Sequence, residues 1–160
     1  MHEALTTYFQ GEKNAGLLLT GMAIAALLAA GVLVRQRFDL RSFAVTLGVL
    51  ALVELGIGVG LYLRTGPQVD RLLDQLRSDP EAFRAAEGAR MARVQRNFAT
   101  IEYVELALIL AGALIAVTQK TRPTLTGVAL AILVQASALL AFDLVAERRG
   151  AAYLSVLGPR

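Results

Sequence analysis

The sequence contains no cysteine, no tryptophan and a single histidine, His2, among its 160 residues. Without thiols or further imidazoles, the chain has no means to form a disulfide framework, a thiolate metal site, haem ligation, or a catalytic system built on cysteine or histidine. Charged residues are also scarce, at 18%, whereas apolar residues make up 56%. Soluble domains usually contain about 25% charged and about 45–50% apolar residues. The composition therefore predicts a protein whose solvent is a lipid bilayer.

Four apolar runs in the sequence are long enough to span a bilayer. They cover residues 15–34, 43–63, 99–117 and 125–145. A helix of about 20 residues crosses a hydrocarbon core of about 30 Å. A secretory signal is the competing interpretation of the first run, but signal cores are shorter and no polar mature domain follows. We therefore expect one all-α domain, an integral membrane four-helix bundle with both termini on one side, in which helices one plus two can pair with three plus four as two hairpins.

The connection between the second and third runs is the only one long enough to hold structure of its own. Gly66-Pro67 is expected to end the second membrane helix, and residues 67–98 to form an amphipathic helical arm outside the membrane. Ser78-Asp79-Pro80 has the N-cap and the first-position proline of a new helix. The next proline is Pro123, so this helix is expected to run unbroken through the third run, over about 40 residues and about 60 Å.

Positive charge is distributed unequally between the two sides of the predicted bundle. Most lysine and arginine residues lie on the side of the termini and the arm; those on the opposite side are Arg35, Arg37, Arg41, Lys120 and Arg122. This count places both termini in the cytoplasm, although close to the membrane the two sides carry nearly equal positive charge. The arm arginines are expected to bind a partner or anionic lipid headgroups, and they are Arg84, Arg90, Arg93 and Arg96.

The N-terminal residues 1–14 precede the first apolar run and carry two aromatic side chains, Tyr8 and Phe9. Tyrosine and other aromatic residues often lie at the level of the lipid headgroups. We therefore expect a short interfacial helix that is separate from the first membrane span.

Glu54 is the only charged residue within the second run, and it lies near the centre of that run. A carboxylate at this depth costs at least about 2.5 kcal/mol unless it is protonated or partnered. Leu47 and Gly58 share its helical face, so the carboxyl group is expected to point into a helix interface and to be protonated at neutral pH. Gln135 lies at a similar depth in the fourth run.

Two roles for Glu54 follow from this position. It is either a protonatable site for coupled transport, or a neutral acid that is hydrogen-bonded to Gln135 or to its symmetry mate in an oligomer. The structural role is the preferred interpretation, because a single intramembrane acid lacks the chain of partners that a proton relay normally has.

A second acidic cluster is expected at the membrane interface on the side of the arm, where Glu102 and Glu105 lie at the same depth as Asp143. These carboxylates could bind a divalent cation or pass protons. Salt bridges that hold the arm to the bundle are preferred, because arginines are interleaved with them. Helical spacing also predicts one packed stripe, within a sector of about 80°, formed by Glu87, Met91, Val94, Phe98, Glu102, Glu105, Ile109, Gly112 and Ala116.

Small residues recur at every fourth position in three of the predicted spans. They are Gly21, Ala25 and Ala29; Gly56 and Gly60; and Gly127 and Ala131. Such spacing allows helix backbones to approach closely. Together with the packed stripe, it predicts a homo-oligomer, with a dimer as the preferred form.

The chain also carries two sets of short motifs. One is Tyr8-Phe9-x-Gly11-Glu12-Lys13, and the other comprises Phe83, Glu87, Arg90-Met91, Val94, Asn97-Phe98 and Glu102. In these residues the chain resembles a group of small bacterial four-helix membrane proteins. The resemblance implies a bacterial inner membrane, and because no activity is established for that group it implies no catalytic or binding residues.

The leading functional prediction is a polytopic inner-membrane protein without enzymatic activity, cofactor or bound metal, which acts through its arm as an assembly or interaction module. The alternative is a small proton-linked transporter or channel that uses Glu54. The expected partners are the lipid bilayer, anionic lipid headgroups and further copies of the chain. Nucleic acid is not expected, since the sequence has no aromatic and basic surface for it, and the chain has neither a glycine-rich phosphate loop nor a Ser-His-Asp set.

Overall fold

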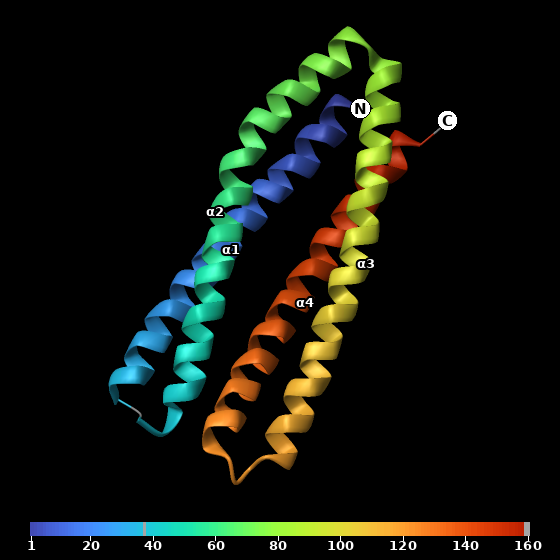
Figure 1. Ribbon diagram of the computed structural model, residues 1–160. Helices are drawn as coiled ribbons and strands as arrows, with labels where there is room; N and C mark the ends of the chain where they lie inside the picture. The colour runs from blue at the N-terminus through green and yellow to red at the C-terminus, as the bar shows by residue number, and fades with distance from the viewer. Residues whose placement is uncertain (37, 159–160) are drawn as a thin grey trace.

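The computed structural model describes residues 1–36 and 38–158 as an all-helical bundle. Its elements are α1 (His2–Gln36), a short 3-10 turn η1 (Phe38–Leu40), α2 (Arg41–Ser78), α3 (Pro80–Thr118) and α4 (Pro123–Leu157). Both termini lie at the same end of the bundle as the turn between α2 and α3 (Figure 1). We call this end the terminal end, and the opposite end, with η1 and the α3–α4 connection, the loop end.

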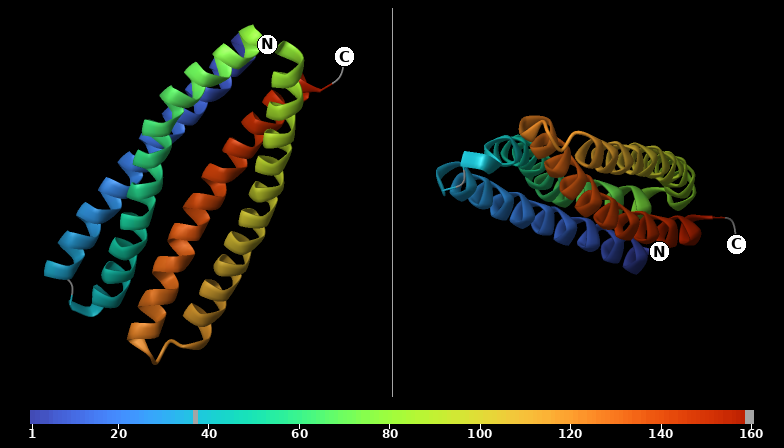
Figure 2. Two further views of the ribbon diagram at one scale, coloured as in Figure 1. Left: turned by 45° about the horizontal axis from the view of Figure 1, so that its top comes forward. Right: turned by 90° about the horizontal axis from the view of Figure 1, so that it is seen from below.

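The four helices are arranged as two hairpins. α1 packs most extensively against α2, and α3 against α4, while the contact between the hairpins is made mainly by α2 and α4. α2 and α3 contact each other much less, although a tight turn joins them (Figure 2). The pairing of helices one with two and three with four is therefore confirmed.

The bundle is apolar on its outside as well as its inside. Each helix contains a segment that is long and apolar enough to cross a membrane. Large apolar side chains such as Leu28, Leu52 and Leu110 are more than half exposed, whereas small residues such as Ala51 and Ala131 are buried. Contiguous exposure of this kind is unfavourable in water and suits hydrocarbon. These features indicate a multi-pass membrane protein.

The predicted N-terminus of the third helix is confirmed. Asp79 is the N-cap, and its Oδ1 accepts a hydrogen bond of 3.0 Å from the backbone N–H of Ala82. Pro80 occupies the first turn, where its missing N–H leaves no hydrogen bond unmade. α3 then continues for 39 residues to Thr118 without interruption.

The predicted end of the second membrane helix at Gly66-Pro67 is wrong, because α2 continues through Pro67 to Ser78. A proline inside a helix removes one backbone hydrogen bond and bends the helix. α2 does bend along its terminal-end half (Figure 1). Beyond the proline, Leu72 is buried in the core at the terminal end, and this packing keeps the segment helical.

The separate interfacial helix predicted for residues 1–14 is also wrong. These residues are the first turns of α1, which runs unbroken into the first membrane segment. Phe9 is only 1% exposed and Tyr8 is buried beside it, so neither ring is available to lipid headgroups. The other helices cover the apolar surface of these two rings. The sequence of residues 1–14 does not reveal this contact, because it depends on residues far away in the chain.

Residues 67–98 do not form a separate arm. They are the terminal-end halves of α2 and α3, and the ends of α1 and α4 cover their apolar face. All four helices contribute to one core at the terminal end, formed by Leu5, Tyr8, Phe9, Leu72, Phe83, Met91, Tyr153 and Leu157. The stripe predicted on α3 is buried or half-buried along its whole length, and it packs mainly on α4.

The helices approach closely at glycines, but only some of them are the predicted ones. A Cβ atom on Gly58 would lie 2.8 Å from the backbone nitrogen of Thr20, and one on Gly16 would lie 2.9 Å from the carbonyl oxygen of Gly58. By contrast, a Cβ on Gly21, Gly56 or Gly60 would meet no described atom within 4 Å, so these glycines make no close helix contact within the described part of one chain.

The fourth helix does make the predicted contact. A Cβ on Gly127 would meet the backbone nitrogen of Phe43 at 3.0 Å, and Ala131 is fully buried. The recurrence of small residues at every fourth position thus identified the packed face of α4. In α1 and α2 it selected a face that points away from the other helices of the bundle, because small residues lie on more than one side of these helices.

The difference between Gly58 and Gly60 provides a direct test of this packing. We expect Gly58→Ala to lower the free energy of unfolding by about 1–3 kcal/mol, because its methyl group would force α1 away from α2. The measurement is denaturant titration in mild detergent, followed by circular dichroism. Gly60→Ala is the control and should cause no loss. Equal stability of the two variants would contradict the assigned α1–α2 interface.

Candidate functional site

A cavity of about 460 Å³ lies between the four helices, and we call it the central cavity. Its volume is in the range of sites that hold small organic molecules. Val53 and Ile57 of α2 and Ile101 of α3 line it and are exposed at its edge. The cavity therefore opens sideways between α2 and α3, within the segments that are apolar enough to span a membrane.

Glu54 lies in the central cavity on α2, opposite Gln135 of α4. Gln135 Nε2 donates a hydrogen bond to Glu54 Oε1, so the partnership expected from the sequence is present. Glu54 is 3% exposed, and its second oxygen, Oε2, has no hydrogen-bond partner within the described part of the chain. The hydrogen bond thus satisfies only half of this carboxyl group.

A second pair of acidic side chains lines the same cavity closer to the terminal end. Glu105 of α3 and Asp143 of α4 face each other as hydrogen-bonding partners, and Glu102 lies close to both. Glu105 is 6% exposed, and neither its Oε2 nor the Oε1 of Glu102 has a hydrogen-bond partner among residues 1–36 and 38–158. The structure therefore brings the two predicted acidic groups, Glu54 and the interfacial cluster, into one space.

The salt bridges predicted for the interfacial cluster are not formed. Over the described residues, no lysine or arginine makes an ion pair with Glu102, Glu105 or Asp143. The neighbouring Arg93 and Arg96 are exposed on the outer side of α3. Closeness in sequence was misleading here, because residues on opposite sides of a helix point in opposite directions.

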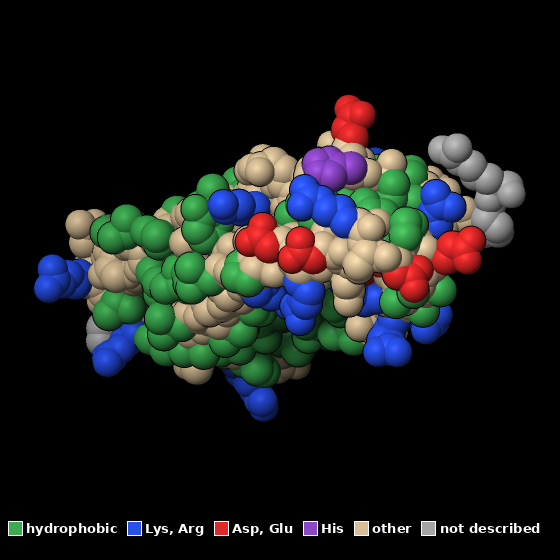
Figure 3. Space-filling model, turned by 90° about the horizontal axis from the view of Figure 1, so that it is seen from above, with side chains coloured by type: hydrophobic (Ala, Val, Ile, Leu, Met, Phe, Trp, Pro, Cys, Tyr) green, Lys and Arg blue, Asp and Glu red, His purple; other side chains and the backbone are tan. Residues whose placement is uncertain are grey.

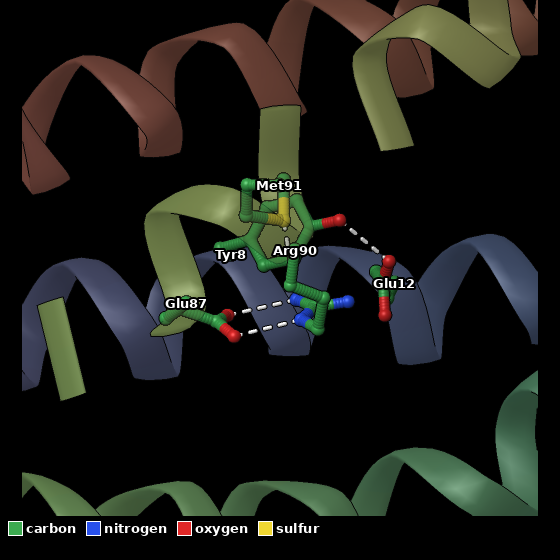
Figure 4. Close-up of polar contacts among 5 residues, drawn as sticks. All are labelled: Tyr8, Glu12, Glu87, Arg90 and Met91. Carbon is green, nitrogen blue, oxygen red and sulfur yellow. Dashed lines mark hydrogen bonds and ion pairs between the residues drawn. The ribbon is translucent and has the colours of Figure 1, made fainter. Parts of the chain in front are cut away.

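Charged groups at the terminal end of the cavity do have partners (Figure 4). Arg90 donates two hydrogen bonds of 2.7 Å to the two carboxylate oxygens of Glu87, which is 2% exposed. The Arg90 guanidinium also lies 5.7 Å from the centre of the Phe9 ring. A bidentate pair of this kind compensates a buried carboxylate. The charge on Glu87 and the side chain of Arg90 are therefore structural.

Two further polar contacts lie at this end of the bundle. The Tyr8 hydroxyl donates a hydrogen bond of 2.6 Å to Glu12 Oε1, and Arg149 donates one of 2.5 Å to the carbonyl oxygen of Gly11. The Tyr8 ring stacks on Tyr153 with ring centres 4.7 Å apart. These contacts join the beginning of α1 to the end of α4.

The predicted arm arginines do not form one group. Arg84, Arg93 and Arg96 are exposed on α3, whereas Arg90 turns inward to Glu87. Acidic and basic side chains lie together on the surface of the terminal end (Figure 3). Arg90 is therefore not available to a lipid headgroup in the way that the sequence analysis expected.

The sequence identified Gln135 and Asp143 on α4, but not the other cavity residues of this helix. One signal was present, because the cavity residues of α4 follow helical spacing of three and four residues. They are Gln135, Leu139, Phe142, Asp143, Ala146 and Arg149. This spacing alone does not identify a cavity, because the residues that pack one helix against another follow the same spacing.

The composition of the site limits its chemistry. Throughout the described ranges, no group of three or more His, Asp or Glu side chains is arranged to hold a metal ion. The cavity instead combines apolar walls with carboxyl groups at two depths, an arrangement suited to binding protons or a cationic organic molecule. No protein-family model, curated protein or solved structure matches the chain.

The stacked tyrosines predict a loss of stability at alkaline pH. Burial, and then the charge of Glu12, raise the pKa of Tyr8; burial, and then the charge of Glu87, raise the pKa of Tyr153. Above the ordinary tyrosine pKa of about 10, the unfolded chain releases protons that the folded chain keeps, so the free energy of unfolding should fall as pH rises.

This prediction is checked by unfolding titrations between about pH 9 and pH 11, on either side of the ordinary tyrosine pKa. Tyr8→Phe and Tyr153→Phe should each flatten the alkaline decline. Tyr103→Phe, at a tyrosine that is 75% exposed, is the control and should keep the wild-type slope. An unchanged slope in both core variants would contradict the assignment.

Proposed function

We propose that this chain is a multi-pass protein of the bacterial inner membrane that acts as a small proton-linked transporter or channel using Glu54, without enzymatic activity. The observation that carries the proposal is the presence of incompletely partnered carboxyl groups at two depths of one cavity. Ionisable side chains inside a membrane are unfavourable and usually belong to ion or substrate pathways.

The central cavity removes the main objection to this function. A lone intramembrane acid lacks the partners of a proton relay, but Glu105 and Asp143 line the same cavity as Glu54. Glu12 and Arg149 line it at the terminal end, where the polar contacts of α1 and α4 begin. A route from the middle of the bilayer to the terminal end would thus have carboxyl groups along it.

The proton function predicts a flux that depends on one side chain. Proteoliposomes that contain the protein should collapse an imposed pH gradient faster than empty vesicles, with the membrane potential clamped. Glu54→Gln should return the rate to that of empty vesicles while leaving the fold intact, since glutamine keeps the hydrogen-bonding shape of a neutral acid. Glu81→Gln, on the exposed first turn of α3, should retain the wild-type rate. A wild-type rate equal to that of empty vesicles would contradict the proposal.

In the proposed topology the termini and the terminal-end halves of α2 and α3 lie in the cytoplasm. The excess of arginine on that end supports this orientation. The loop end, with η1 at residues 38–40 and the connection at residues 119–122, would then face the periplasm.

The absence of native cysteine allows this orientation to be measured directly. In intact cells, Gln75→Cys at the exposed terminal end should react with a membrane-permeant maleimide but not with an impermeant one. Thr124→Cys, exposed at the loop end, should react with both. The reverse pattern would show that the topology is inverted.

An assembly or interaction module is the second candidate function. Arg84, Arg93 and Arg96 are exposed at the terminal end, where anionic lipid headgroups or a protein partner would reach them. The small residues Gly21, Gly56 and Gly60 also face outward and suit contact with a second copy in a homodimer. No Glu54-dependent flux, together with a dimer in nanodiscs, would favour this candidate.

A further inference from the structure

We propose that the central cavity binds a lipophilic organic cation, such as an amine or onium ion carrying apolar groups, which enters from the bilayer between α2 and α3 and pairs with Glu54 or Glu105. This inference rests on the proposed transport function, because it assigns the class of substrate. Its first support is the unmet bonding capacity of the cavity. Oε2 of Glu54 and Oε2 of Glu105 are buried without a hydrogen-bond partner within the described residues.

The walls of the cavity favour an organic ion over a metal ion. Ca²⁺ and Mg²⁺ need six or more oxygen ligands, whereas much of this lining is hydrocarbon. The apolar lining includes Leu50, Ile57 and Leu61 of α2, Phe98 and Ile101 of α3, and Leu139 and Phe142 of α4. Phe98 and Phe142 add aromatic rings to this lining, and such rings attract cations. A molecule that fits must therefore combine apolar surface with positive charge.

The position of the opening favours a molecule that is dissolved in lipid. The edge of the cavity is formed by Val53 and Ile57 on α2 and by Ile101 on α3. α2 and α3 contact each other much less than the helices of either hairpin do, which leaves room for an opening on this side. Entry there requires no passage through the polar contacts at the terminal end.

The partners of the charged groups decide the sign of the ligand. The basic groups that line the cavity are Arg64 of α2, Arg90 of α3 and Arg149 of α4. Arg90 is neutralised by Glu87, Arg149 is bound to the carbonyl oxygen of Gly11, and Arg64 is exposed. The acidic groups are Glu12 of α1, Glu54 of α2, Glu105 of α3, with Glu102 close by, and Asp143 of α4.

Among these acids, only Glu12 receives a hydrogen bond from the polar contacts at the terminal end, through Tyr8. Glu54 has one partner for two oxygens, and the hydrogen-bonding partner of Glu105 is another acid, Asp143. The cavity groups with unmet hydrogen-bonding capacity are therefore carboxyl groups, which become negative when they lose a proton. A singly charged cation that pairs with a protonated carboxyl group would release one proton, so that the charge of the cavity is conserved.

The inference is tested by binding rather than by transport. Tetraphenylphosphonium should bind the purified protein in nanodiscs saturably, with about one ion per chain above the uptake of empty nanodiscs. Exchange with one proton predicts an affinity that rises by up to about tenfold for each unit of pH. Tetraphenylborate has the same shape and the opposite charge, and should bind far more weakly.

Variants locate the site. Glu54→Gln or Glu105→Gln should weaken binding by about tenfold or more and reduce its pH dependence, whereas Glu81→Gln should leave both unchanged. Because the chain has no tryptophan, Phe142→Trp introduces a single fluorescent reporter into the cavity wall without altering a carboxyl group. Tetraphenylphosphonium should change its emission, and Leu52→Trp on the exposed side of α2 is the control.

Three results would overturn the inference. They are equal binding of tetraphenylborate, pH-independent binding that survives both carboxyl substitutions, and an unchanged Phe142→Trp emission. The outcome is separable from that of the transport proposal. Binding without Glu54-dependent flux would support the cation site and contradict transport, whereas flux without binding would overturn the cation site alone.

Discussion

The hydrogen bond between Gln135 and Glu54 connects the two hairpins at a depth where neither lipid nor a basic side chain offers a partner to a carboxyl group. In hydrocarbon, a buried polar group has to be satisfied by another part of the protein. α2 and α4 therefore have to lie close together at this level. An opening in the bundle has to lie between another pair of helices. The central cavity opens between α2 and α3, which contact each other much less than the helices within either hairpin do.

The buried charged and polar groups of the bundle differ in how many hydrogen-bond partners they have. At the terminal end, Glu87 is held by two short hydrogen bonds from Arg90, and the Tyr8 hydroxyl is bound to Glu12. Large aromatic and aliphatic side chains fill the space around these pairs. In the cavity, the carboxyl groups of Glu54 and Glu105 keep oxygens without such partners. A stable end and an incompletely satisfied interior are what a binding site on a rigid scaffold requires.

Several local patterns were correct because they depend on neighbouring residues alone. Asp79 and Pro80 start α3 because a carboxylate caps free N–H groups and proline has none to lose. Pro67 was misleading, because one missing hydrogen bond is a small penalty beside the core contacts of the segment that follows it. The glycines of α2 were misleading for another reason. Gly56 and Gly60 have the right spacing, but Gly58, on the opposite face, meets α1.

The sequence by itself determined the class of the protein, the four apolar helices and the unusual position of Glu54, since these follow from composition, length and helical periodicity. It also identified Gln135 as a partner for Glu54, because both lie at similar depth in their spans. Only the tertiary structure decided that Glu105 and Asp143 share a cavity with Glu54, and that Arg90 pairs with Glu87 instead of with a lipid. Which side chains meet depends on the rotation of each helix about its axis, and that rotation is set by packing across the whole bundle.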